Sequence, residues 1–272
     1  TGADRHHIDL VDNLRWDLSY DATGKGSAQD GHGHGTHCAG TIGATGSNNI
    51  GVVGVNHQVG IIPLKGFSDS GSATDSGLAS CINSATFYKT QGHNVVATSN
   101  SWGGAPLSRV LEDAIRAAFR QNIVTVASAG NSTTDCDRNN CAWNYTGGGL
   151  IVVAAMDRNG QAANFSSYGR TTVDIAAPGG AGLPVDSANI WSTIPGNGYD
   201  SWAGTSMACP HVSGAVALLA SMFPSASATD LIDAILDSAA PTTDFGASGR
   251  SPVASGGRLD VFAASQRLGS PA

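Results

Sequence analysis

The chain has little charge and no long apolar run. Charged residues make up 13% of its 272 residues, against about 25% in an average globular domain. Acidic residues outnumber basic ones by 21 to 14, which argues against the basic surface that nucleic-acid binding needs. No run approaches the ~18 apolar residues that span a bilayer. The composition therefore predicts a compact domain that has no nucleic-acid or membrane partner.

Cysteine is scarce and odd in number. The chain has five cysteines, so at least one has no partner within it. Cys136 and Cys141 lie close together in the polar stretch "DCDRNNCAWN". They either close a small disulfide ring, which would indicate an oxidising compartment, or remain two free loop thiols.

Short β-branched runs alternate with helical stretches along most of the chain. Residues 107–122 have the apolar periodicity of an amphipathic helix, with Val110, Leu111, Ala114, Ile115, Ala118 and Phe119 on one stripe. Nearly continuous apolar runs favour strands that are buried on both faces of a parallel sheet. Five such runs occur, at 60–67, 94–102, 122–130, 150–157 and 171–179. The alternation predicts a single α/β domain.

Three histidines stand close together in "GHGHGTH", residues 31–37. The spacing of His32 and His34 suits a zinc site, but no carboxylate or cysteine set accompanies the histidines at metal-binding spacing. The other interpretation makes one of them a catalytic base whose partners lie elsewhere in the chain.

Polar residues also follow several predicted strands, where functional groups of parallel sheets gather. Asn131 comes directly after the small residues of "ASAGN", and "SNSWGG" ends an earlier strand with two glycines. Ser206 stands at the predicted start of a helix in "GTSMACPHVSG". A serine there is either an ordinary helix cap or a nucleophile beside the positive end of the helix dipole.

Together these segments resemble the subtilases, the subtilisin-like serine peptidases. "GHGTHCAGTIGA" is similar to their histidine segment, "SAGN" to their oxyanion segment and "GTSMACPHVSG" to their serine segment, in family order. The cysteine in the histidine segment resembles the proteinase K branch. The resemblance covers nearly the whole chain. It implies one catalytic domain over residues 1–272, with a three-layer α/β fold whose mostly parallel central sheet is flanked by helices, and a secreted endopeptidase.

The resemblance also assigns roles to residues. His34 would be the general base, Ser206 the nucleophile and Asn131 the donor to the oxyanion. Two walls would bind an extended peptide or protein substrate largely through its backbone, which predicts broad specificity. These walls are Ser101, Trp102 and Gly103 on one side and Ser128, Ala129 and Gly130 on the other. An inhibitory propeptide, removed when the zymogen is processed, is a further partner that the resemblance implies.

A structural calcium ion is implied as well. "GSNNIGVVGV" resembles the calcium loop of the family, and Asp9 resembles the acidic ligand that faces it. Oxygen ligands of this kind suit Ca²⁺. The expected ligands are Asp9, Gly46, Asn48, Ile50 and Val52. The alternative is a glycine-rich turn that holds no ion.

The front of the chain departs from the family pattern. The resemblance makes Thr1–Gly2 the tail of the motif that carries the catalytic aspartate, so this aspartate and its strand would lie upstream of Thr1. Asp4, Asp9 and Asp12 do not follow an apolar strand. Two function classes stay open. One is a serine endopeptidase that receives its aspartate from an upstream segment, and the other is an inactive subtilase fold used for binding or regulation.

Overall fold

The computed structural model describes residues 1–104, 106–182, 188–246 and 249–269. Its helices are α1 (His34–Gly43), α2 (Asp75–Thr90), α3 (Arg109–Arg120), α4 (Thr205–Met222), α5 (Ala228–Asp237) and α6 (Val261–Gly269), with a 3₁₀ turn at Trp16–Leu18. Its strands are β1 (Tyr20–Asp21), β2 (Leu64–Lys65), β3 (Ala97–Asn100), β4 (Val124–Ser128), β5 (Leu150–Met156), β6 (Ile175–Pro178), β7 (Ile190–Ile194), β8 (Gly198–Trp202), β9 (Ala240–Pro241) and β10 (Gly257–Arg258).

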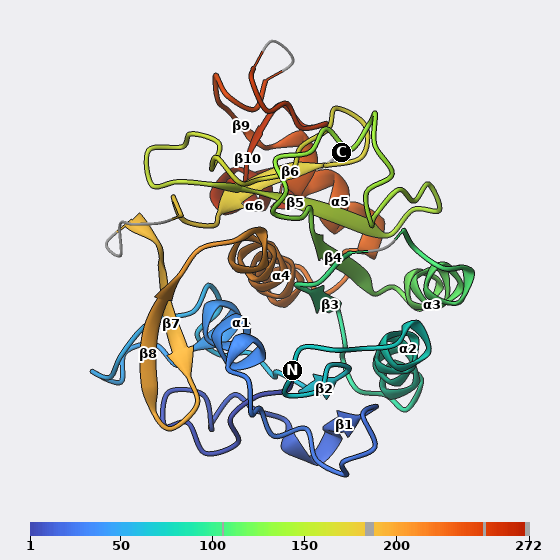
Figure 1. Ribbon diagram of the computed structural model, residues 1–272, viewed down its shortest axis with the longest axis vertical. Coiled ribbons are helices and arrows are strands. Elements are labelled where there is room, and N and C mark those ends of the chain that lie inside the picture. The colour runs from blue at the N-terminus through green and yellow to red at the C-terminus, as the bar shows by residue number, and fades with distance from the viewer. Residues whose placement is uncertain (105, 183–187, 247–248, 270–272) are drawn as a thin grey trace.

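The main sheet has six strands in the order β3-β4-β5-β6-β10-β9. All neighbouring pairs are parallel except β9 with β10. The predicted strands appear here as β3 to β6, and the run at 60–67 contains β2. A parallel sheet needs a crossover between successive strands, and α3 provides one between β3 and β4 (Figure 1).

The sheet is covered on both faces, which confirms the expected three layers. Alternate residues of β4 point to opposite sides: Val124 and Val126 belong to the core beneath α4, α5 and α6, whereas Ala127 belongs to the core beneath α2 and α3. Figure 1 shows α4 lying against one side of this sheet while α2 and α3 lie together on the other. Strands buried on both faces explain the nearly continuous apolar runs of the sequence.

Two details of the sequence interpretation can now be decided. On α3, Leu111, Ala114, Ile115 and Ala118 are buried as expected, but the prediction for Val110 was wrong because its side chain is 46% exposed. Cys136 and Cys141 form a disulfide. No helix among the described residues has the length and apolarity to cross a membrane.

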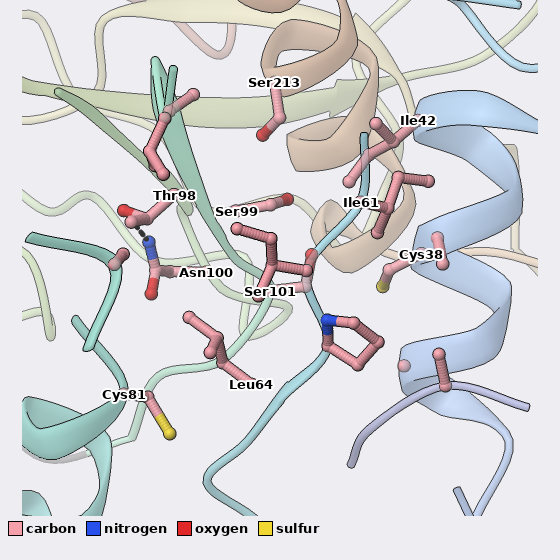
Figure 2. Close-up of a pocket in the computed structure, with 18 of the residues that line it drawn as sticks. Cys38, Ile42, Ile61, Leu64, Cys81, Thr98, Ser99, Asn100, Ser101 and Ser213 are labelled. Atoms are coloured by element: carbon pink, nitrogen blue, oxygen red, sulfur yellow. Dashed lines mark hydrogen bonds between the residues drawn. The ribbon is translucent and has the colours of Figure 1, made fainter. Parts of the chain in front are cut away.

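The sheet is interrupted between β2 and β3. β2 pairs in parallel with β1, β3 pairs in parallel with β4, and neither has a second partner strand among the described residues. A cavity of about 750 Å³ lies between them, whereas native interiors have few voids larger than a water molecule. Figure 2 shows it enclosed by α1 with Cys38, by Leu64, by Cys81, by Thr98 to Ser101 and by Ser213 of α4. We call this cavity the slot.

Candidate active site

His34 is the first residue of α1, and the segment before it is held by Asp30. Gly33, with φ 105°, allows the left-handed turn into the helix. The buried Asp30 carboxylate accepts hydrogen bonds from the backbone nitrogens of His32 and Gly33 and from both the nitrogen and the hydroxyl of Thr36. Burial alone would raise the pKa of Asp30, but these bonds hold it below its usual value. The sequence analysis missed Asp30, although an aspartate just before a helix start is a capping signal.

Ser206 is the second residue of α4. Its Oγ donates to the carbonyl of Ser101 at 3.3 Å, and the Ser101 hydroxyl donates to the carbonyl of Ser206 at 2.8 Å. The buried Cys38 thiol of α1 contacts the same carbonyl at 3.5 Å. The two helices that carry His34 and Ser206 thus pack together, although no hydrogen bond joins the two side chains here. Such catalytic bonds are often loose before substrate binds.

The Asn131 amide has a defined orientation. Its Oδ1 accepts from both the backbone nitrogen and the hydroxyl of Thr205 at 2.9 Å. Because the oxygen is used in this way, Nδ2 faces Gly204, where a Cβ would lie 3.4 Å from it. A free amide donor therefore stands beside the start of α4, next to Ser206. This is the geometry that an anion-stabilising donor requires.

His34 also lines the slot, and its surroundings disfavour its charged form. Burial above all, together with the nearby His32 and His37, lowers the pKa of His34 to about 4 against the opposing charge of Asp30. Among the described residues no carboxylate is hydrogen-bonded to His34. Asp4 binds Gln29 and the backbone of Gly196 instead.

One neighbour of His34, Trp202, comes from the hairpin formed by β7 and β8, which the sequence did not predict. The Trp202 indole stacks on His37 at 4.7 Å and lies 6.5 Å from the His34 ring. Its Nε1 donates to the Asp200 carboxylate at 2.7 Å. His37 is fully buried, as expected of a packing residue, and its Nε2 faces the carbonyl of Ile190. The described residues contain no cluster of three or more metal-binding side chains at these histidines or elsewhere.

The two predicted substrate walls lie next to each other. Ser101, Trp102 and Gly103 continue from the end of β3, and Ser128, Ala129 and Gly130 leave the end of the neighbouring β4. The Ser128 hydroxyl donates to the Trp102 carbonyl at 3.4 Å. Trp102 packs against Trp143, with the ring centroids 4.7 Å apart.

Three of the five expected calcium residues, Asp9, Asn48 and Val52, come together. The Asp9 carboxylate is fully buried and accepts from the Asn48 amide at 2.8 Å, from the Val52 nitrogen at 3.0 Å and from the Tyr199 hydroxyl at 3.2 Å. Burial, the charge of Asp9 and this hydrogen bond raise the pKa of Tyr199 to about 12. No lysine or arginine pairs with Asp9 in the described part of the chain. The carboxylate therefore has no cationic partner.

Comparison with known proteins supports the same family. A family model described as the subtilase family of S8 peptidases matches residues 1–258. The chain is 39% identical to subtilisin DY of Bacillus licheniformis over 77% of its length and 71% of that protein. It is 38% identical to thermitase of Thermoactinomyces vulgaris over 84% of its length and 75% of that protein.

Solved structures agree with this assignment. The fold matches a cold-adapted subtilisin-like serine proteinase with a TM-score of 0.75 and 27% identity, covering 96% of this chain and 84% of that one. These matches do not test the resemblance to the proteinase K branch, which stays a prediction. The chain belongs to the subtilase family and is a subtilisin-like serine endopeptidase.

Proposed function

We propose that Ser206 is the nucleophile, His34 the general base and Asn131 the oxyanion donor of this endopeptidase. The observation that carries the proposal is the shared position of His34 and Ser206 at the N-terminal ends of α1 and α4, which pack against each other. Helix N-termini favour the negative charge that develops during acyl transfer. All three side chains are present, so an inactive binding protein is the less favoured reading.

The chemistry follows from these positions. A serine hydroxyl is a weak nucleophile near neutral pH and needs an adjacent base. His34 takes the proton of Ser206 Oγ as the oxygen attacks the peptide carbonyl, and later donates it to the leaving amine. The Asn131 amide and the Ser206 backbone nitrogen then hold the negative oxygen of the tetrahedral intermediate.

A third group completes the site in this proposal: a carboxylate on a β-strand that fills the slot and comes from outside residues 1–272. The slot lies between the free edges of two parallel strands, and His34 is part of its wall. An extended segment there would pair with both β2 and β3 and join the two sheets. A carboxylate at its end would orient the imidazole, stabilise its cation and raise the low pKa of His34.

Strand complementation tests this third group. Residues 1–272 are refolded with a synthetic peptide of alternating valine and alanine that ends in aspartate, or with a matched peptide that ends in asparagine. We expect both peptides to protect Cys38 and Cys81, whose thiols line the slot, from a small mercurial reagent. Only the aspartate peptide should restore peptide hydrolysis. Equal hydrolysis without any peptide would contradict the proposal.

Substrate would bind as an extended strand along the 101–103 wall, with the 128–130 wall beside it and the stretch around Gly71 to Thr74 on its other edge. In this mode most of the affinity comes from hydrogen bonds to the substrate backbone, so we expect the enzyme to cleave many different sequences. Trp102 would shape the preference for particular substrate side chains. The same surface would accept an inhibitory propeptide before zymogen processing. The disulfide between Cys136 and Cys141 supports a secreted, extracellular enzyme, because such bonds persist in oxidising compartments.

We also propose a structural calcium ion at Asp9. The support is a fully buried carboxylate that no lysine or arginine of the described residues pairs with, beside the loop that carries Asn48 and Val52. Gly46, Ile50 and Val52 would add their carbonyl oxygens as further ligands. The Asn48 amide now turns its nitrogen to Asp9, so its oxygen would face the ion only after a rotation of the amide.

Chelation tests the ion. A ligand that binds only the native state stabilises it by mass action, so a chelator should lower the melting temperature, and Asp9→Asn should remove that sensitivity. A melting curve that responds neither to chelator nor to added Ca²⁺ would rule out a stabilising ion.

A further inference from the structure

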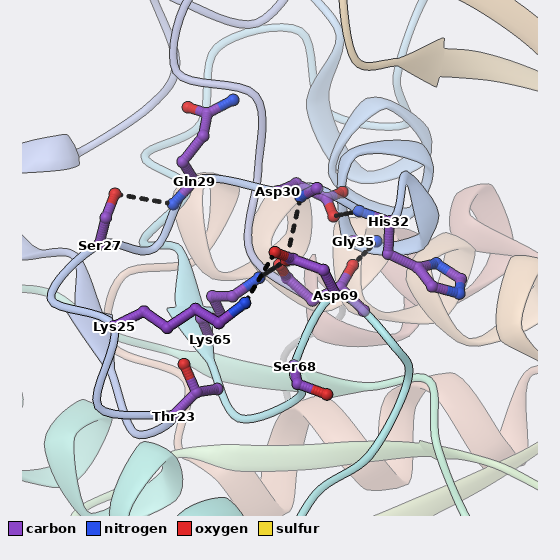
Figure 3. Close-up of polar contacts among 12 residues, drawn as sticks. Thr23, Lys25, Ser27, Gln29, Asp30, His32, Gly35, Lys65, Ser68 and Asp69 are labelled. Atoms are coloured by element: carbon purple, nitrogen blue, oxygen red, sulfur yellow. Dashed lines mark hydrogen bonds and ion pairs between the residues drawn. The ribbon is translucent and has the colours of Figure 1, made fainter.

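Asp69 joins two segments that border the active site. Its Oδ1 accepts from the Lys65 ammonium at 2.7 Å and from the Gly31 backbone nitrogen at 3.3 Å, and its Oδ2 accepts from the Lys25 ammonium at 3.2 Å. Figure 3 shows the side chains of Lys25 and Lys65 converging on this carboxylate. The two lysines hold the pKa of Asp69 at about 2, so its charge persists throughout the working range of the enzyme.

Lys65 is an unusual partner because its side chain is only 1% exposed. Its ammonium has two acceptors, Asp69 and the carbonyl of Thr1. A folded protein is strongly destabilised when a buried charge such as the Lys65 ammonium loses its partner, so the fold holds Asp69 next to it. The position of Asp69 is therefore fixed from the inside of the protein, even though the carboxylate itself is 40% exposed.

On the other side, Asp69 touches the segment that leads to His34. A Cβ on Gly31 would lie 2.7 to 2.9 Å from the Asp69 carboxylate, so a side chain at residue 31 would displace this contact. Gly31 stands between Asp30, which holds the start of α1, and His32. The contact thus ties Asp69 to the same short segment that positions the base.

The ends of the loop that carries Asp69 line the same cavity as His34 and the 101–103 wall, and we call the part of the cavity between this loop and the wall the groove. The loop closes on itself through hydrogen bonds from the Ser68 nitrogen to the Ser72 carbonyl and from the Gly71 nitrogen to the Ser68 carbonyl. The ring of Phe67, just before the loop, is tilted against that of Trp102, with the ring centroids 6.4 Å apart. Gly66, Phe67 and Gly71 therefore line one cavity with the 101–103 wall and His34.

We propose that Asp69 is a positioning residue that clamps this loop to the histidine segment and so sets the width of the groove for an extended substrate. Lys65 anchors the clamp, Lys25 reinforces it at the surface, and Gly31 is the contact on the histidine side. The inference rests on the proposed function, because it needs substrate to lie between the two sides of the groove.

The test compares a long peptide substrate with a single-residue ester in the active enzyme. The ester reaches Ser206 but not the Asp69 loop. Asp69→Asn keeps the size of the side chain and removes its charge. The ratio of kcat/KM on the peptide to that on the ester should fall about tenfold, the equivalent of one or two main-chain hydrogen bonds, and mainly through KM. Lys65→Met should act in the same direction, and the double variant should lose little more.

The matched control is Asp17→Asn, because Asp17 is an exposed carboxylate paired with Arg15 at 2.7 Å outside the site. It should leave the ratio unchanged. Rates are divided by the concentration of active sites, measured as the amount of Ser206 that a fluorophosphonate labels, so misfolded protein does not affect them. If Lys65→Met fails to fold, Lys25→Met replaces it.

Two results would overturn the inference. An unchanged ratio in Asp69→Asn would mean that the clamp does not act on substrate. An equal loss on both substrates, carried by kcat, would mean that Asp69 only supports His34. Neither result would contradict the proposed function, which is tested separately: it would be wrong if Ser206→Ala retained activity.

Discussion

Asp174 offers a stability prediction whose size follows from the structure. The carboxylate lies at the end of the segment before β6, and its Oδ2 accepts a single hydrogen bond, from the Val152 nitrogen at 2.7 Å. Burial raises the pKa of Asp174 from 3.8 to about 6, against this hydrogen bond. At about 1.36 kcal/mol per tenfold change in proton affinity, the charged form costs about 3 kcal/mol of stability above pH 6.

The pH dependence has a definite sign. Because the pKa is raised in the folded state, the stability that this group contributes is present below about pH 4 and is lost as the pH rises through 6. Asp174→Asn keeps the shape and the hydrogen-bond acceptor but carries no charge. The variant should therefore match the wild type at pH 4 and exceed it at pH 8.

Thermal unfolding measures the difference. For a chain of this length, about 3 kcal/mol corresponds to a melting temperature about 5 °C higher for Asp174→Asn at pH 8. Asp157→Asn is a suitable control, since that carboxylate lies in an exposed turn. A variant less stable than the wild type at pH 8 would refute the reasoning. It would show that the buried charge of Asp174 is compensated.

Three further predictions concern the chemistry. Ser206→Ala and His34→Ala should each abolish peptide hydrolysis, and the double variant should lose little more because the pair acts as a unit; additive losses in kcat would contradict the assignment. Asn131→Leu should lower kcat by about 10²–10³, the loss found for the oxyanion asparagine of a subtilisin, with KM little changed; a rise in KM alone would assign Asn131 to substrate binding. Peroxide should inactivate the enzyme through Met207, buried beside Ser206; Met207→Ala should resist it, and equal sensitivity would place the damage elsewhere.

The strands and the catalytic segments were predictable because they depend on local patterns. Apolar runs fixed the positions of β3 to β6, and the segments around His34, Asn131 and Ser206 have a specific order and composition. The disulfide was left open between two readings, because sequence spacing permits a bridge but does not require one. Val110 was misplaced because periodicity marks a stripe on a helix but not whether neighbouring elements cover every residue of that stripe.

Contacts between segments that are far apart in the chain could not be predicted from the sequence. Trp202 lies on the ring of His37 although 165 residues separate the two, and nothing in the local pattern of β8 indicates this. The burial of Lys65 is a similar case, since a lysine at a strand end is usually exposed. The interruption of the sheet could be predicted only in part. The resemblance implied a strand upstream of Thr1, but only the structure gives the slot its position and volume.

Labelling by a fluorophosphonate tests the central claim most directly. The probe reacts only with a serine that an adjacent base activates, so mass spectrometry of the peptide that contains Ser206 reports on the assembled site. In the enzyme whose slot holds the carboxylate strand, the account predicts labelling at Ser206 alone, and loss of labelling in His34→Ala. A correctly folded protein that leaves Ser206 unlabelled, or labels it equally well without His34, would contradict the account and favour an inactive subtilase fold.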